Sequence, residues 1–285
     1  MPGHGKSGPE RMYAAYGTNV EQVAGLVSLS GYEGGEPMKT GFSYGDPMAG
    51  TALVGAVCTA LRKRRLEGEG SFVELSQREN LTMFVGEWLV DYSMNGEPRE
   101  PTGNRNPLIA PHNRYASAGH DAWITIACQD DEEFRALATT IGQPELADDP
   151  RFATMAARKE NEVELDGIIE AWTSQKGHYE AMHILQHAGV TAGAVLTIPE
   201  LMSDPQLRYR GAWQEQTHPD AGTWEMETPP WLLGRTPGGL RIPPPGFGDH
   251  NQYVLRELLG LDEERIARLY EQGITADEPD ASLHV

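Results

Sequence analysis

The segment GFSYGDPMAGTALVGAVCTALRKRRLEGEGSFVE, residues 41–74, carries the clearest structural signal in the chain. It delivers one acid, Asp46, from a glycine-containing loop to the start of a predicted helix over residues 48–65. Aspartate is a favoured N-cap residue, because its carboxylate accepts hydrogen bonds from the first free amides of a helix. Pro47 suits the first helical position, where the N–H that proline lacks would have no partner. We therefore expect Asp46 to be the N-cap of a long helix.

The end of this helix is also marked. Residues 62–65 are four cations, which suit the negative end of the helix dipole, and Gly68 and Gly70 stop the helix. Residues 71–75 are then predicted to form a short strand. One face of the helix carries only small side chains, which would let another backbone come close: Ala49, Gly50, Ala52, Gly55, Ala56 and Ala60.

Two interpretations of Asp46 remain open at this point. On spacing alone, a helix cap is the commoner role for an aspartate before proline. The same geometry suits a nucleophile, because a helix N-terminus stabilises the carboxylate anion and keeps it available to attack a carbonyl. Gly45 and the neighbouring backbone amides could then hold the resulting oxyanion.

The composition limits the classes of protein to consider. The chain has 285 residues, of which 39% are hydrophobic, enough for one or two domains. With 23 Lys and Arg against 42 Asp and Glu, its net charge of −19 argues against nucleic acid or an anionic membrane as the main partner. Cys58 and Cys128 read as reduced core residues of a cytosolic protein, and neither a signal peptide nor a long apolar run is present. We therefore expect a cytoplasmic protein.

Hydrophobic periodicity and turn residues predict the other elements. Leu81, Phe84, Val85, Trp88, Leu89 and Tyr92 form an amphipathic face on one helix, which Ser76 and Glu79 begin as a capping box. Strands are expected at 123–128 and 190–197, and a hairpin at 212–229. A polar tail begins at residue 275. The predicted helices cover residues 18–30, 76–94, 131–141, 161–173, 178–188, 250–259 and 262–272.

Few other residues suggest a site. The loop Gly103-Asn104-Arg105 combines backbone freedom with a cation, and its functional and structural roles are about equally plausible. His183 and His187 are spaced to face one metal, but no third ligand is evident, so we predict no metal site. The cations at 62–65 are typical of a solvated helix end, with a ligand phosphate as the alternative.

Seven stretches, taken together and in order, resemble the class III CoA-transferase family, which includes formyl-CoA transferases and the carnitine and bile-acid-inducible CoA-transferase group. They span almost the whole chain, so the match is specific to the family and poor for the substrate. The stretches are GPERMYAAYGTNVEQVAGLVSLSGYEGGEP, YGDPMAGTALVGAVCTALRKRRLEGEGSFVELSQRE, TGNRNPLIAPHNRYA, DAWITIA, LADDPRFATMAARKEN, AGVTAGAVLTIPELMSDPQL and GFGDHNQYVLRELLG.

The resemblance implies an activity. Asp46, with Gly50 four residues on, matches the family's nucleophile, which attacks an acyl-CoA thioester and then carries CoA as an aspartyl thioester to a carboxylic acid. The ordered matches thereby reverse the preference for a purely capping role. The family uses the CoA thioester as substrate and no tightly bound cofactor. Gly103, Asn104 and Arg105 fall where relatives carry a mobile loop over the active site, so they are the candidate CoA-binding residues.

The resemblance also implies an α/β fold, with a Rossmann-like large domain and a smaller α+β domain. We expect residues 1–95 to begin the large domain and to carry the nucleophile. Residues 96–190 would form the small domain and its linkers, and residues 191–285 would return to the large domain. The family has a nucleotide-type half ahead of the region matched by residue 1, so this large domain is expected to be incomplete. Family members form interlocked dimers, so we expect a homodimer or a partner subunit that supplies the missing half.

Two alternatives to an active transferase follow from the same resemblance. The chain could be a non-catalytic subunit or a truncated remnant of the fold, because most CoA contacts of the family come from the missing half. A third possibility is an α-methylacyl-CoA racemase. Racemases of the superfamily place a catalytic His, followed by Asp, where this chain has Tyr16 and Gly17. This difference disfavours a racemase, and it also removes an auxiliary acid that some transferases have.

Overall fold

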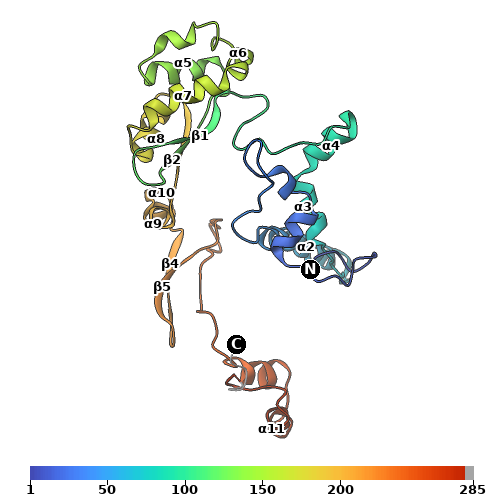
Figure 1. Cartoon of the computed structure of the whole chain (residues 1–285). Helices are drawn as coiled ribbons and strands as arrows, with labels where there is room; N and C mark the ends of the chain where they lie inside the picture. The colour runs from blue at the N-terminus through green and yellow to red at the C-terminus, as the bar shows by residue number, and fades with distance from the viewer. Residues whose placement is uncertain (280–285) are drawn as a thin grey trace. The chain divides into compact units, whose positions relative to one another are not determined.

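The computed structural model describes residues 1–279 and divides into two compact units, Met1–Val195 and a second that begins at Leu196 (Figure 1). The expected polar tail therefore lies partly outside the described residues. The architecture is mixed α/β, as predicted, although both sheets of the described chain are antiparallel. No helix among residues 1–279 is both long and apolar enough to cross a membrane. The break after Val195 lies close to the predicted boundary at 190/191, and the three-segment division remains a prediction.

The first unit begins with helices. Their order is α1 (Gly17–Val23), the 3-10 turn η1 (Val27–Leu29), α2 (Gly45–Glu67), α3 (Gln77–Phe84) and α4 (Gly86–Asn95). Val20, Ala24 and Leu81 form a small buried cluster where α1, α2 and α3 meet, with Ala15, Tyr44 and Met48 packed around it. This cluster is the base on which the start of α2 rests.

The helix predicted from the opening segment is confirmed, but its first turn differs from the prediction. Tyr44 is the N-cap and has no side-chain capping bond, so Asp46 is the second residue of the helix. The N-cap prediction for Asp46 is therefore wrong. Pro47 still lies in the first turn, where no intrahelical amide is needed. Gly68 ends the helix in the left-handed conformation, with φ of 80°.

Two further predictions for this segment are wrong. Residues 71–75 form no strand, and neither sheet of the described chain includes them. Cys58 is exposed on α2, whereas Cys128 is buried as predicted. The small-residue face of α2 is covered only at its start: Ala49 is buried, whereas a Cβ added at Gly50 or Gly55 would meet no atom within 4 Å outside the neighbouring residues and backbone of its own helix in the described chain.

Two of the predicted helices are each broken in two. The helix expected over 18–30 ends after Val23, because Gly25 takes a positive φ of 87°, and only a 3-10 turn follows. The helix expected over 76–94 is interrupted at Val85, which ends α3 and begins α4. Of the apolar face predicted for it, Leu81 and Val85 are buried, while Phe84, Leu89 and Tyr92 are about half exposed.

The rest of the first unit is a sheet covered by helices. Strands β1 (His112–Ala116), β2 (Trp123–Ala127) and β3 (Thr191–Val195) pair antiparallel in that order, so Tyr115 lies opposite Ile124 and Ile126 opposite Ala192. The helices gather on one face of this sheet (Figure 1). They are α5 (Asp131–Thr140), η2 (Pro144–Ala147), α6 (Met155–Glu160), α7 (Glu162–Thr173) and α8 (His178–His187).

The predicted elements of this region are confirmed, and Gly189 follows α8 with a positive φ of 84°. The core beneath the helices is continuous and well buried, with Phe134, Phe152 and Leu165 at its centre. Arg158 is fully buried beside this core and donates to Ala110 O at 2.8 Å, Phe152 O at 2.9 Å and Asp131 Oδ1 at 2.7 Å. Its guanidinium therefore ties the entry to β1 to helix α6.

The second unit contains a hairpin and short helices. Strands β4 (Trp213–His218) and β5 (Gly222–Glu227) form the predicted hairpin, with its turn at residues 219–221. Helices α9 (Ile198–Ser203) and α10 (Pro205–Tyr209) precede it. The two final helices are also confirmed, as a π-helix η3 (Tyr253–Leu258) and as α11 (Glu263–Glu271), which Asp262 caps.

Candidate active site

A buried carboxylate sets the approach to α2. Glu21 of α1 is fully buried and accepts hydrogen bonds from Tyr44 N at 2.6 Å and from Thr40 Oγ1 at 2.7 Å. A buried carboxylate is costly unless hydrogen-bonded, so these two donors stabilise it and in turn fix the loop. These two hydrogen bonds hold Thr40 and Tyr44, and so fix the loop immediately before Asp46.

The carboxyl group of Asp46 has two unlike oxygens. Oδ1 accepts a hydrogen bond from Nε2 of Gln77 at 2.9 Å. Oδ2 lies against the backbone of Gly17, where an added Cβ would be 2.4 Å away, and no residue within 1–279 donates a hydrogen bond to it. Asp46 itself is exposed. The site therefore has one oxygen anchored by Gln77 and one that accepts no hydrogen bond from the described chain.

The start of α3 positions Gln77. Gln77 is the first residue of that helix and is 8% exposed, and Ser76 Oγ caps the helix by accepting from Glu79 N at 3.3 Å. Backbone carbonyls from the beginning of the chain complete the cap: Gln77 N donates to Pro2 O at 3.1 Å and Arg78 N to Gly3 O at 3.0 Å. Three separate segments thus meet at Asp46.

The second candidate, the loop Gly103-Asn104-Arg105, is held by ion pairs. Arg105 directs Nη1 to Glu33 at 2.8 Å, Nη2 to Asp166 at 3.2 Å and Nε to Glu162 at 3.9 Å. Burial lowers the pKa of Arg105, but the hydrogen bond to Asp166 and the charges of all three carboxylates outweigh burial and raise it. The guanidinium is therefore permanently charged and occupied by protein carboxylates.

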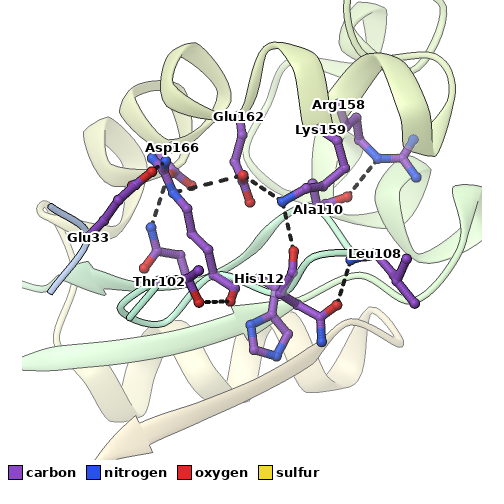
Figure 2. Close-up of polar contacts among 12 residues, drawn as sticks. Glu33, Thr102, Leu108, Ala110, His112, Arg158, Lys159, Glu162 and Asp166 are labelled. Atoms are coloured by element: carbon purple, nitrogen blue, oxygen red, sulfur yellow. Dashed lines mark hydrogen bonds and ion pairs between the residues drawn. The ribbon is translucent and has the colours of Figure 1, made fainter. Parts of the chain in front are cut away.

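Further contacts fix the same loop on α7 and β1 (Figure 2). Lys159 donates to Glu162 at 2.7 Å and to the carbonyl of Asn106 at 2.8 Å. Asp166 also accepts from the amide of Asn113 at 2.9 Å and from the Tyr115 hydroxyl at 2.8 Å. Burial, followed by the charge of Asp166, raises the pKa of Tyr115, so this hydroxyl keeps its proton.

A cavity of about 600 Å³ lies beside this loop. It is lined by residues 103–105 of the loop and by His112, Thr125 and Gly193 of the sheet. His112 Nδ1 lies 2.7 Å from the carbonyl oxygen of Asn104, which closes one end of the loop onto β1. The cavity is large enough for part of a cofactor-sized molecule.

The two candidate regions are not joined directly. Within residues 1–279, no hydrogen bond or ion pair links Asp46 to residues 103–105. The candidate metal ligands His183 and His187 do not form a metal site. His187 Nδ1 lies 2.6 Å from the backbone oxygen of His183, and no three His, Cys, Asp or Glu residues of the described chain are placed to hold a metal together. The cations at 62–65 are exposed at the end of α2.

Sequence reasoning missed Glu21 and Gln77. A signal existed for Glu21, because it is the one charged residue of its helix, GTNVEQV, and lies next to the apolar Val20. Gln77 follows the capping residue Ser76, and nothing in its local sequence links it to Asp46, 31 residues away. Both residues act on the nucleophile region through the tertiary fold.

Comparison with known proteins gives a consistent result. The family model described as CoA-transferase family III matches residues 1–251. The chain is 36% identical over 269 residues to the succinyl-CoA–D-citramalate CoA-transferase of Chloroflexus aurantiacus, covering 94% of this chain and 67% of that protein. It is 29% identical over 258 residues to the succinate–glutarate CoA-transferase of Agrobacterium fabrum, covering 90% of this chain and 64% of that protein.

A solved structure extends the likeness to the fold. The crystal structure of a CAIB/BAIF family protein from Brucella suis superposes with a TM-score of 0.80 at 28% identity, covering 90% of this chain and 66% of that one. The chain thus spans about two thirds of the length of the relatives it matches.

Proposed function

Because the chain belongs to CoA-transferase family III, we propose that it carries the reacting carboxyl of an enzyme that moves CoA between an acyl-CoA thioester and a carboxylic acid. Asp46 is the proposed covalent nucleophile. The observation that carries this proposal is the state of its carboxyl, with Oδ1 anchored by Gln77 and Oδ2 free of protein donors within the described chain. A carboxylate in the first turn of a long helix is also stabilised as the anion that attacks.

The proposed reaction uses Asp46 twice. Oδ2 attacks the carbonyl carbon of the donor thioester, and CoA leaves as the thiolate, which produces a mixed anhydride. The thiolate then attacks Cγ of Asp46, the donor acid leaves with Oδ2, and an aspartyl-CoA thioester remains. The acceptor carboxylate attacks Cγ in turn, and the released thiolate takes the acyl group from the new anhydride. Asp46 is regenerated, and one thioester has replaced another.

Dicarboxylic acids are the substrate class that we propose. Two of the relatives are named for succinyl-CoA or succinate, and their other substrates are named as D-citramalate and glutarate. The CoA portion would lie along the loop Gly103-Asn104-Arg105. Because the guanidinium of Arg105 is already occupied by carboxylates, its role here is to anchor the loop, and Gly103 and Asn104 line the cavity beside it.

The assembly is likewise a proposal. We propose a homodimer or a complex with a partner subunit as the active form, and one relative, from Chloroflexus aurantiacus, is named as the beta subunit of a succinyl-CoA–L-malate CoA-transferase. A cytoplasmic location, expected from two cysteines that are not paired with each other, also remains a prediction.

The first prediction tests Asp46 directly. Incubation of the wild-type chain with succinyl-CoA should add CoA to Asp46, detected by intact mass and by mapping the hydroxamate that hydroxylamine leaves at this residue. Asp46→Ala should abolish the adduct, because no other carboxyl occupies that position. Asp148→Ala, which removes an exposed acid of the sheet region, is the control and should leave the adduct unchanged. An undiminished adduct in Asp46→Ala would exclude Asp46, and no adduct on the wild-type chain would exclude covalent catalysis by this chain.

A further inference from the structure

We propose that Gln77 is a catalytic residue of the same site, whose side-chain amide stabilises Oδ1 of Asp46 when that oxygen takes up negative charge. The inference rests on the proposed role of Asp46 as nucleophile and adds the group that makes its carboxyl carbon a good electrophile. It concerns a residue that the family's motif does not single out in this chain, and it follows from contacts within residues 1–81.

The geometry assigns the two oxygens of Asp46 to different tasks. Nε2 of Gln77 lies 2.9 Å from Oδ1, the distance of a sound hydrogen bond. Oδ2 instead lies on the bare backbone of Gly17. The amide can only donate to a carboxylate, so the contact fixes which oxygen is held. Oδ2 is then the oxygen that attacks the substrate and departs with the donor acid.

The amide is held rigidly enough to act in this way. Gln77 is 8% exposed, and its backbone amide donates to Pro2 O at 3.1 Å. Leu81, one turn further along α3, is fully buried in the cluster that also contains Val20. Because the residue is fixed by its own helix and by the chain's first residues, its side chain needs little reorganisation during reaction. Preorganised donors of this kind are the main source of oxyanion stabilisation in enzymes.

The charge on Oδ1 develops in a defined step. When the CoA thiolate attacks Cγ of the mixed anhydride, an S–C bond forms and the pair of the Cγ=Oδ1 double bond moves onto Oδ1. The Gln77 N–H then faces an oxyanion. Collapse re-forms Cγ=Oδ1, breaks the Cγ–Oδ2 bond and releases the donor carboxylate. Attack by the acceptor carboxylate on the aspartyl-CoA thioester passes through the same oxyanion. No proton moves to or from Gln77, so a neutral amide suits every state.

Three variants test the role. Gln77→Leu keeps the size and removes the donor, and Gln77→Glu keeps the shape but replaces the donor with a charge. We expect both to slow formation of the aspartyl-CoA adduct, Gln77→Leu by about 10- to 100-fold. Arg78→Gln, on the same turn of α3 with its side chain on Glu10, is the control and should form the adduct at the wild-type rate. A merely structural role would lower the melting temperature in step with the rate, whereas the proposed role leaves the melting temperature of the uncharged variant Gln77→Leu near that of the wild type.

A second measurement does not depend on activity. In the chain labelled with ¹⁵N at glutamine side chains, the Gln77 amide signal is identified by its absence in Gln77→Leu. We expect Asp46→Ala to move this signal toward the shift of a solvated glutamine. An unmoved signal would overturn the proposal.

The outcomes separate the two proposals. Wild-type rates of adduct formation in Gln77→Leu would overturn the role of Gln77 while leaving Asp46 as nucleophile. Absence of the adduct on the wild-type chain would instead overturn the proposed function, and the role of Gln77 with it. A slowed adduct together with a moved amide signal supports both.

Discussion

Gly17 determines where the carboxyl of Asp46 can lie. A Cβ at this position would be 2.4 Å from Oδ2 of Asp46 and 2.5 Å from Cβ of Ser43, distances that no real side chain tolerates. The carboxyl of Asp46 thus uses the space that a side chain at residue 17 would fill.

A prediction follows for Gly17→Ala. The added methyl group must displace the carboxyl or the loop at Ser43, so we expect the rate of aspartyl-CoA formation to fall by about 100-fold, as for a catalytic group moved by about 1 Å. The control is Gly41→Ala, in the same approach to α2, where an added Cβ would meet no atom within 4 Å. Equal rates for Gly17→Ala and wild type, measured by intact mass over time, would contradict the close packing.

Cys128 makes stability depend on pH. Burial, with a further effect from Glu133, raises the pKa of this thiol to about 12, against an ordinary value of 9.0. The folded state therefore holds the proton while the unfolded state loses it, so stability is fully present below pH 9 and is lost as pH rises toward 12. Tyr115, whose pKa is also raised, acts in the same direction.

We expect the free energy of unfolding to depend less on pH in Cys128→Ala than in the wild type. Urea unfolding between pH 8 and pH 11 should show a free energy of unfolding that falls less steeply for the variant than for the wild type, although the variant starts lower because it leaves a cavity. Parallel curves would mean that the thiol does not titrate differently in the two states. Cys58→Ala is the matched control, because Cys58 is exposed and should leave the slope unchanged.

At the scale of single residues, Asp46 could be predicted from the sequence, but Glu21 and Gln77, which hold the region around it, could not. Asp46 was recognisable because it begins a long helix and matches a family motif. Glu21 and Gln77 lie 23 and 31 residues from the groups they contact. Their roles depend on how α1 and α3 pack beside α2, and no local pattern encodes that arrangement.

Among the elements, α3 is the one whose start matters most for the site. Ser76 caps it and the carbonyls of Pro2 and Gly3 accept its next amides, so the position of Gln77 depends on this cap. We expect Ser76→Ala to lower the free energy of unfolding of the helical part by about 1 kcal/mol. Ser93→Ala is the control, because Ser93 bonds only within its own helix, to Val90 O. Chemical denaturation followed by circular dichroism measures both, and equal losses would argue against a capping role.

Elements with strong local signals could be predicted. Helices α5, α7 and α8 have apolar faces and clear ends, and they lie where the sequence places them. The failures have tertiary causes. Residues 71–75 have strand-like side chains but no neighbouring strand in the described chain. The helices expected over 18–30 and 76–94 break at Gly25 and Val85, where packing among α1, α3 and α4 overrides a continuous apolar pattern.

At the scale of the whole molecule, the two clusters of the first unit differ greatly in size. Sixteen buried residues form the core between the sheet and its helices, whereas three form the cluster of α1, α2 and α3. Hydrophobic burial is the main source of stability, so these regions should open at different free energies. The proposed nucleophile lies in the less stable one.

Amide hydrogen exchange should therefore be faster in α2 than in the strands of the sheet. Only Gly45 and Ala49 of α2 are buried, while Val54, Leu61 and Leu66 are at least half exposed. An isolated helix is marginal in water, so we expect the amides of α2 beyond its second turn to exchange orders of magnitude faster than those of β2. Mass spectrometry of peptic fragments measures both, and iodoacetamide should modify Cys58 of the folded chain while sparing Cys128.

Protection of α2 equal to that of β2, together with an unreactive Cys58, would mean that another copy covers this helix in solution. A partner subunit that binds α2 would slow exchange in this helix only when it is added.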